Sequence, residues 1–126
     1  MPRKSFASDH LPSAGLPFSP AVLGAGDALY LSGQVGQDPA TGRLADGVAA
    51  QTDQALRNLQ AVLAAAGKTL DDVVRVGVYL TDLRADFTAM NEAYARWFAE
   101  PYPARTTIGV AALPMGAAVE IDLVAR

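Results

Sequence analysis

The sequence predicts an α+β protein in which two helices pack on one face of a single mixed β-sheet. Two segments, 47–66 and 85–99, place apolar residues at the helical spacings of three and four. Short runs rich in β-branched residues surround them, and 73–80 is the longest. The chain of 126 residues suits one domain, so we expect residues 1–126 to fold as a single unit with the element order β-β-β-α-β-α-β-β.

The first part of the chain is predicted to be extended. A short strand is expected at 4–8, followed by an irregular loop at 11–20, which holds three prolines and a glycine. Residues 22–23 and 28–32 have the composition of strands. The segment 24–27 between them, Gly-Ala-Gly-Asp, suits a hairpin turn.

The helix predicted at 47–66 has the clearest pattern in the chain. Asp46 is placed to cap its start, and Gly67 stands where helices often end in a left-handed residue. The apolar positions form one stripe, and the opposite side is expected to face solvent through Gln54, Arg57, Asn58 and Gln60.

A central strand and a second helix are predicted next. Thr69 and Asp72 have the spacing of a capping pair around one short turn, and the strand at 73–80 follows. Its continuous apolar face is expected to consist of Val74, Val76, Val78 and Leu80. The buried stripe of the helix at 85–99 is expected to consist of Phe87, Met90, Tyr94 and Trp97, with Phe98 beside it. Burial of one helix face requires this spacing, so these residues are interpreted as core.

The last stretch, 105–126, is predicted to be a β-hairpin because two β-rich runs flank a Pro/Gly turn. Side chains alternate across a strand, so Arg105, Thr107 and Gly109 share one face of the first run. In the second run, apolar positions alternate with Glu120. If the apolar sets of both strands cover one core, Arg105 and Glu120 lie together on the opposite face. This shared face is the candidate active site.

That opposite face is itself half apolar, since we expect it to carry Gly77, Tyr79, Gly109, Ala111 and Val124. No predicted helix remains to cover it. We therefore expect a second subunit to cover it, with Arg105 and Glu120 at or near the interface. Pockets often form at such interfaces.

Composition argues against several classes of partner and cofactor. The formal net charge is -3 and no Lys/Arg cluster occurs, which disfavours a nucleic-acid partner. No apolar run approaches the ~20 residues that cross a bilayer. The N-terminus lacks the pattern of a signal peptide, so we expect no membrane partner and a cytoplasmic location. With no cysteine, one histidine and no Gly-rich phosphate loop, no metal and no cofactor are expected.

A few polar residues could carry chemistry. Arg105 could hold a small carboxylate through its planar fork, or act only as a solvated or salt-bridged cation. Glu120, if partly desolvated, could orient or deprotonate a water, and an ion pair with Arg105 is the alternative. Ser32, Gly33 and Gln34 are expected to end a strand, where hydroxyl and open backbone N–H groups can meet an anion, and a plain exit from strand to turn is the alternative. Asn91 lies near the apolar side of its helix, so its amide needs a partner, and a helix-to-loop hydrogen bond would suffice.

Several segments along the chain form a series found in one family. They are LYLSGQ at 29–34, DPxTG at 38–42, QTxQALxNL at 51–59, VYLTD at 78–82, FxxMNxxY at 87–94, PART at 103–106 and LPxGAxVEI at 113–121. Because so many segments agree in one order, the chain resembles the Rid family (RidA/YjgF-like reactive intermediate deaminases) over nearly its whole length.

The resemblance implies a chorismate-mutase-like fold and a homotrimer with three sites in the clefts between subunits. It also implies hydrolysis of reactive enamines and imines, such as 2-aminoacrylate and 2-iminobutyrate, to 2-keto acids and ammonia. Arg105 corresponds to the family arginine that holds the substrate carboxylate, and Glu120 to the acid that positions the attacking water. Ser32, Gly33 and Asn91 correspond to positions that line the cleft.

Two positions depart from the family pattern. Members often have Gly-Pro-Tyr-Ser where this chain has Leu-Pro-Phe-Ser at 16–19, so Phe18 lacks the phenol hydroxyl. A cysteine often found two residues after the arginine is Thr107 here. Loss of the hydroxyl removes one hydrogen bond worth ~1 kcal/mol. We expect this loss to narrow the substrate range or slow the reaction rather than abolish it.

The working hypothesis is an enamine/imine deaminase that uses Arg105 and Glu120 as catalytic residues. Its substrate-binding residues are expected to be Arg105, Ser32, Gly33, Phe18, Asn91 and Thr107. A related hypothesis is the deamination of a different enamine, for example in a catabolic pathway. A non-catalytic regulatory trimer that binds small carboxylates in the same cleft is the alternative that Phe18 favours. Ribonuclease activity, attached to some relatives of this family, is disfavoured by the acidic charge balance.

Overall fold

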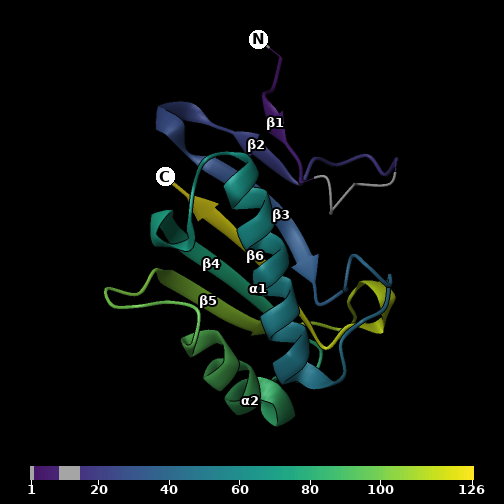
Figure 1. Cartoon of the computed structure of the whole chain (residues 1–126). Helices are drawn as coiled ribbons and strands as arrows, with labels where there is room; N and C mark the ends of the chain where they lie inside the picture. Colours follow the sequence, from purple (N-terminus) through teal and green to yellow (C-terminus); the bar gives the residue numbers. More distant parts are fainter. Residues whose placement is uncertain (1, 9–14) are drawn as a thin grey trace.

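The computed structural model describes residues 2–8 and 15–126, and its elements follow the predicted order (Figure 1). The strands are β1 (Ser5–Phe6), β2 (Ala21–Leu23), β3 (Leu29–Val35), β4 (Val73–Leu80), β5 (Ala104–Gly109) and β6 (Val119–Ala125). The helices are α1 (Gly47–Ala65) and α2 (Leu83–Ala95). Single turns of 3-10 helix lie at Ala25–Asp27, Leu70–Asp72 and Pro114–Gly116. Part of the predicted loop at 11–20 lies outside the described residues.

The strands form one mixed sheet in the order β1-β2-β3-β6-β4-β5. β4 and β5 run parallel, and the other neighbouring strands run antiparallel. Both helices cover the same face of this sheet, and no described helix covers the other face, which we call the open face (Figure 1). The predicted α+β architecture is therefore confirmed, and so is the hairpin of β2 and β3 around 24–27.

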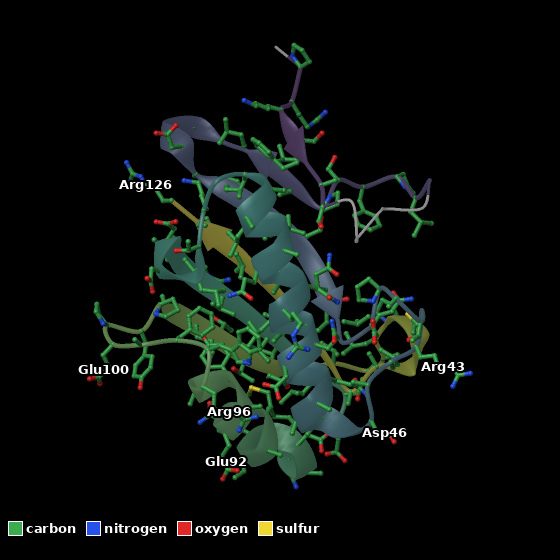
Figure 2. The ribbon with its side chains drawn as sticks, viewed as in Figure 1. Arg43, Asp46, Glu92, Arg96, Glu100 and Arg126 are labelled. Atoms are coloured by element: carbon green, nitrogen blue, oxygen red, sulfur yellow. The ribbon has the colours of Figure 1, made fainter. Side chains whose placement is uncertain are left out.

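The core lies between the sheet and α1. This helix contributes a stripe of side chains with no measurable exposure, namely Ala55, Leu56, Leu59, Val62 and Leu63. The central strands contribute Val76, Val78 and Leu80 from β4, and Val119, Ile121 and Leu123 from β6. Burial of these apolar surfaces, worth about 25 cal/mol per Å², is what holds the helix to the sheet. Charged side chains such as Arg43, Glu92 and Glu100 point outward (Figure 2).

The predicted hairpin of the last stretch is wrong. β6 inserts between β3 and β4, and β5 instead pairs with β4 in parallel, on the side of β4 away from β6. The reason is the connection through α2. A strand that follows a crossover helix returns to the sheet parallel to the strand before the helix. The Pro/Gly turn then serves as a longer link, in which Met115 and Gly116 both adopt positive φ.

The apolar face of β4 also differs from the prediction at one position. The pairing with β6 shifts register between Val73 and Arg75, as a β-bulge does, so Val74 points outward and is 49% exposed. Val73 takes its place in the core. Because a bulge adds one residue, it reverses the alternation of side chains on its far side, and a strict period of two cannot anticipate it.

The second helix begins two residues earlier than expected and ends at Ala95. Asp82 caps its start by accepting a hydrogen bond from the backbone N–H of Ala85 at 3.1 Å. Met90, Tyr94 and Phe98 are buried as predicted, whereas Trp97 is half-buried. Phe87 is 38% exposed, so its assignment to the core is wrong.

Details of the first helix and the following turn agree in part with the predictions. Asp46 occupies the N-cap position, but its side chain makes no capping hydrogen bond. Gly67 is left-handed with φ of 74°, and Thr69 and Asp72 form the predicted capping box. Asn58, expected in solvent, is instead 2% exposed and donates from Nδ2 to the carbonyls of Gln37 and Val35. It thereby ties α1 to the end of β3.

None of the helices in the described residues has the length and hydropathy to cross a bilayer. The cytoplasmic location stays a prediction.

Candidate functional site

The structure divides the predicted site residues between the two faces of the sheet. Arg105 is the register partner of Val76, a core residue beneath the helices, so its side chain leaves β5 on the helix-covered face. Glu120 is the register partner of Tyr79, whose side chain lies on the open face. The prediction that Arg105 and Glu120 share a face is therefore wrong. Alternation along a strand shows which of its residues share a face. It shows which residues of two strands share a face only when the strands pair, and β5 does not pair with β6.

The same two residues are also separated within the plane of the sheet. β4 lies between their strands, which places those strands about 10 Å apart. Their partners on β4 are Val76 and Tyr79, three residues apart, which adds about 10 Å along the strand. The alternative in which Arg105 and Glu120 form an ion pair within one chain is therefore also wrong.

On the helix-covered face, Asn91, Arg105 and Thr107 form a group that we call the arginine half-site. Arg105 donates from Nη1 to Oδ1 of Asn91 at 2.7 Å. Its guanidinium carbon lies 4.7 Å from the ring centroid of Tyr94 and 6.0 Å from that of Phe87. No carboxylate of the described residues forms a salt bridge with Arg105. A half-buried cation without a counter-charge suits an anionic ligand.

Thr107 lies two residues beyond Arg105 on the same face of β5, opposite Val78. Its Oγ1 is buried and has no hydrogen-bond partner among the described residues, and the same holds for the hydroxyl of Tyr94. Buried hydroxyls are normally paired, so each such exception needs an explanation. A polar ligand beside Arg105 would supply a partner for Thr107.

On the open face, Ser32, Gly33 and Glu120 form a second group, which we call the glutamate half-site. Phe18 is linked to this group through its chain neighbour Ser19, whose carbonyl accepts a hydrogen bond from Ser32. The register of β3 with β6 shifts between Leu31 and Gln34, across Ser32 and Gly33. A Cβ atom on Gly33 would lie only 2.7 Å from Oε2 of Glu120, so the glycine leaves the space that this carboxyl occupies.

Ser32 joins the segment before β2 to the glutamate half-site. Its Oγ donates to the carbonyl of Ser19 at 2.6 Å, and its backbone N–H donates to the carbonyl of Pro20 at 2.9 Å. These bonds tie Ser19, the residue that follows Phe18, to the middle of β3, and the ring of Phe18 is exposed. Ser32 thus has a clear structural role in addition to the predicted binding role.

The side chain of Glu120 is half-buried. Partial burial, followed by repulsion from Asp122, raises the pKa of Glu120 above its ordinary value. Asp122 is held in place by Tyr79, whose hydroxyl donates to Oδ2 at 2.9 Å. A carboxyl with a raised pKa is a better proton acceptor when ionised, and it can orient a water molecule.

Sequence reasoning identified Asn91 as an amide in need of a partner, and that partner is Arg105 rather than a loop. It interpreted Tyr94 only as core. Tyr94 is indeed buried, but it also contacts the guanidinium of Arg105. The signal was available in the sequence, because Tyr94 follows Asn91 by three residues and both side chains must then emerge on one side of α2.

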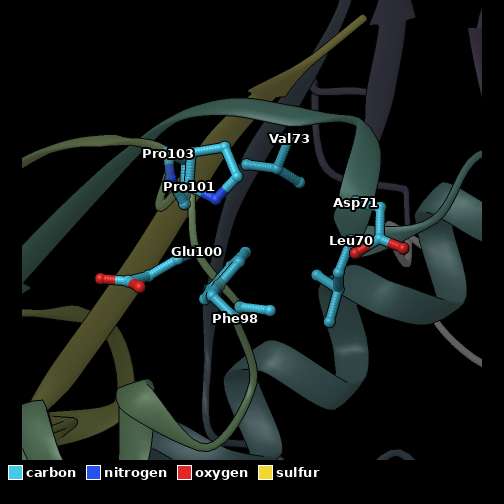
Figure 3. A pocket seen from close by; sticks show the side chains of 8 residues that line it. Leu70, Asp71, Val73, Phe98, Glu100, Pro101 and Pro103 are labelled. Carbon is cyan, nitrogen blue, oxygen red and sulfur yellow. The ribbon is translucent and has the colours of Figure 1, made fainter.

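A cavity of about 290 Å³ lies elsewhere, between the turn before β4 and the loop that links α2 to β5 (Figure 3). It is lined mainly by apolar side chains, including Leu70, Val73, Phe98 and Pro101. None of the predicted site residues lines it. In residues 2–8 and 15–126, no group of three or more His, Cys, Asp or Glu side chains could hold a metal ion.

The fold and the two half-sites define a small α+β protein that offers a cationic anchor and, separately, a proton-accepting carboxyl. The model of the family described as Endoribonuclease L-PSP matches residues 8–126. The chain belongs to this family. The predicted resemblance to the Rid family is confirmed by relatives that bear its names.

Three relatives show how close this similarity is. "Protein DfrA" of Myxococcus xanthus is 48% identical over 99% of this chain and 96% of its own length. The human "2-iminobutanoate/2-iminopropanoate deaminase" is 42% identical over 98% of this chain and 89% of its own length. The crystal structure of RidA from the Antarctic bacterium Psychrobacter sp. PAMC 21119 superimposes with a TM-score of 0.90 at 43% identity, covering 98% of this chain and 99% of that one.

Proposed function

We propose that this protein hydrolyses small carboxylated imines and enamines, of the 2-iminobutyrate and 2-aminoacrylate type, to 2-keto acids and ammonia. The observation that carries the proposal is the guanidinium of Arg105, which is held by Asn91 and has no counter-charge among the described residues. The name of the human relative, a 2-iminobutanoate/2-iminopropanoate deaminase, supports the substrate class. Glu120 supplies the second function that such a hydrolysis requires.

The complete site is proposed to form between two copies of the chain. An imine of three or four carbons cannot reach both Arg105 and Glu120 of one chain, because the two residues lie on opposite faces of the sheet. A neighbouring copy packed on the open face would bring its arginine half-site to this chain's glutamate half-site. The open face carries exposed Tyr30 and Ile108, as a surface that another subunit covers would. A closed ring of three subunits, the expected homotrimer, repeats such a head-to-tail contact three times.

In the proposed reaction, Arg105 binds the carboxylate through paired N–H groups, and backbone N–H groups near Gly33 of the neighbouring subunit support it. Glu120 of the neighbouring subunit orients a water molecule toward the imine carbon and accepts a proton from it. The water oxygen bonds to this carbon as the imine nitrogen gains a proton, which gives a carbinolamine. The amino nitrogen then takes a second proton, the C–N bond breaks, the hydroxyl loses its proton to become the keto oxygen, and ammonia leaves.

The two departures from the family pattern are proposed to modify this site without removing it. Thr107 retains a hydrogen-bonding group in a buried position beside Arg105, so it can contact the substrate or its carboxylate. Phe18 offers only an apolar ring at the glutamate half-site. Both residues are therefore assigned to substrate binding, together with Ser32, Gly33 and Asn91.

The test is a coupled assay in which an amino-acid dehydratase generates 2-aminoacrylate or 2-iminobutyrate. The purified protein should accelerate the appearance of the keto acid. Arg105→Ala should lose about 10- to 100-fold in kcat/KM, the value of one or two charge-assisted hydrogen bonds. An Arg105→Ala variant as active as the wild type would contradict the assignment.

Two other functions make different predictions in the same experiments. A regulatory trimer that only binds small carboxylates would show a thermal shift with 2-ketobutyrate but no acceleration of imine hydrolysis. A ribonuclease, as the family description suggests, would degrade RNA and bind it more weakly as salt increases. The net charge of -3 disfavours the latter function.

A further inference from the structure

We infer that Tyr94 is a positioning residue for Arg105, and that its ring, rather than its hydroxyl, holds the guanidinium in the orientation that receives a carboxylate. The inference rests on the proposed role of Arg105 as the carboxylate anchor. It assigns a functional part to a residue that otherwise belongs to the core.

Contact geometry separates Tyr94 from the other ring near Arg105. The guanidinium carbon lies 4.7 Å from the Tyr94 centroid, against 6.0 Å for Phe87. Tyr94 is 6% exposed, whereas Phe87 is open to solvent. The attraction between a cation and an aromatic face strengthens when water is excluded from the contact. Tyr94 therefore makes the stronger of the two contacts.

The ring of Tyr94 is itself fixed in place. Phe98 packs against it with a centroid separation of 4.8 Å and a tilt of 32°. The ring thus stands between a core aromatic residue and the guanidinium, and it has little freedom to move. A rigid support of this kind lowers the entropy that Arg105 loses when a ligand binds.

Asn91 and Tyr94 restrict different parts of the same guanidinium. Asn91 accepts one N–H from Nη1, which fixes one edge of the plane. Tyr94 contacts the guanidinium through its ring, and its hydroxyl makes no hydrogen bond with Arg105. Since an arginine has five N–H donors, the remaining edges can form a paired contact with a carboxylate.

The hydroxyl of Tyr94 does not contribute to this contact. It is buried and has no hydrogen-bond partner among the described residues. Burial also raises the pKa of Tyr94, although Arg105 opposes this rise, so the side chain stays a neutral phenol. The contact is thus between a cation and a neutral ring. A phenylalanine at position 94 should therefore preserve it.

The test compares variants that separate the ring from the hydroxyl. Tyr94→Phe keeps the ring, while Tyr94→Leu and Tyr94→Met remove it, and the two ring-free variants provide alternatives if one does not fold. Leu63→Ala, a core truncation in α1, controls for loss of stability. Each full-length protein is assayed for 2-ketobutyrate affinity by calorimetry and for the side-chain ¹⁵Nε–H signal of Arg105 by NMR, assigned with Arg105→Lys.

We expect Tyr94→Phe to keep the wild-type affinity within about twofold, and the ring-free variants to weaken it by about tenfold, with KM raised more than kcat is lowered. The Arg105 signal should be shifted by the ring in the wild type and Tyr94→Phe, and should lose this shift in the ring-free variants. Leu63→Ala should leave both readouts unchanged.

Two results would overturn the inference. In the first, Tyr94→Phe loses as much affinity as the ring-free variants, which would assign the role to the hydroxyl. In the second, the ring-free variants keep both the affinity and the shifted signal. Failure of the proposed function is distinguishable, because a protein that does not hydrolyse imines still reports the position of Arg105 through its NMR signal.

Discussion

Arg105 and Glu120 lie on opposite faces of one sheet, because their register partners on β4 are Val76 and Tyr79, which differ in parity. Val76 points into the core, and Tyr79 points to the open face. A single chain therefore presents two half-sites that cannot act on the same small molecule. If both residues act in one reaction, each complete site needs two subunits.

Mixed oligomers of two impaired variants should recover activity. Arg105→Ala retains the glutamate half-site and Glu120→Gln retains the arginine half-site, so a contact between the two kinds of subunit can rebuild one intact site. Random mixing of equal amounts in a ring gives intact sites at about a quarter of the interfaces. We therefore expect about a quarter of the wild-type activity after the variants are unfolded and refolded together.

A mixture of Arg105→Ala with the double variant Arg105→Ala/Glu120→Gln is the matched control. It contains no arginine half-site and should show no gain over Arg105→Ala alone. If the first mixture also shows no gain although it co-assembles by mass spectrometry, Arg105 and Glu120 do not meet across a subunit interface.

Gly33→Ala should reduce activity with little effect on stability. The added Cβ would meet the carboxyl of Glu120 at 2.7 Å, and this flexible end can turn away without disturbing the backbone. Because misplacement of a reacting group is costly, kcat should fall by about tenfold or more. The melting temperature should change by only a few degrees, as for a ΔΔG within about 1 kcal/mol.

The effect of Gly33→Ala should depend on Glu120. In a Glu120→Gln background, the same glycine substitution should cause no further loss of activity, since the group that it displaces is no longer functional. Additive losses in this double-mutant cycle would show that Gly33 acts independently of Glu120.

The activity should fall on the acid side at a higher pH than an ordinary glutamate would give. Burial, and then repulsion from Asp122, raise the pKa of Glu120, and the residue must be ionised to orient water. The acid limb of kcat/KM should therefore lie above pH 4.5, the ordinary value for this group. A limb at or below that value would contradict the role of Glu120.

Asp122→Asn should move this acid limb to lower pH, because it removes the repulsion from Asp122 and leaves burial as the remaining cause of the raised pKa of Glu120.

The raised pKa of Glu120 should also make the free energy of unfolding depend on pH. The folded state binds the Glu120 proton more tightly than the unfolded state does, so this group lowers stability as pH rises from its ordinary pKa through its raised pKa. Thermal melts of Glu120→Gln across this range should lack that component.

Phe18→Tyr should restore the hydroxyl that the family pattern places at this position. One additional hydrogen bond of ~1 kcal/mol corresponds to a gain of about fivefold in kcat/KM. Leu16→Tyr adds the same group two residues away on the same segment and should produce no gain. Equal activity of Phe18→Tyr and the wild type would show that the phenol has no partner in this site.

Local sequence patterns were sufficient for most individual elements. The apolar stripe of α1, the capping box of Thr69 and Asp72, and the positive φ of Gly67 each depend on neighbours in the chain. Such features are set by backbone sterics and short-range hydrogen bonds, so they can be read from spacing. The pairing of β5, the bulge at Val74 and the burial of Asn58 depend on distant segments, and the patterns missed all three.

The sequence by itself determined the element order, the fold class and the family, and it supplied the candidate site residues as a prediction. The tertiary structure alone decided where those residues lie relative to one another. The insertion of β6 between β3 and β4 placed Glu120 on the open face, and the parallel pairing of β5 placed Arg105 beneath α2. The physical reason is that side-chain direction in a sheet follows strand pairing, which is a long-range choice that spacing along the chain does not encode.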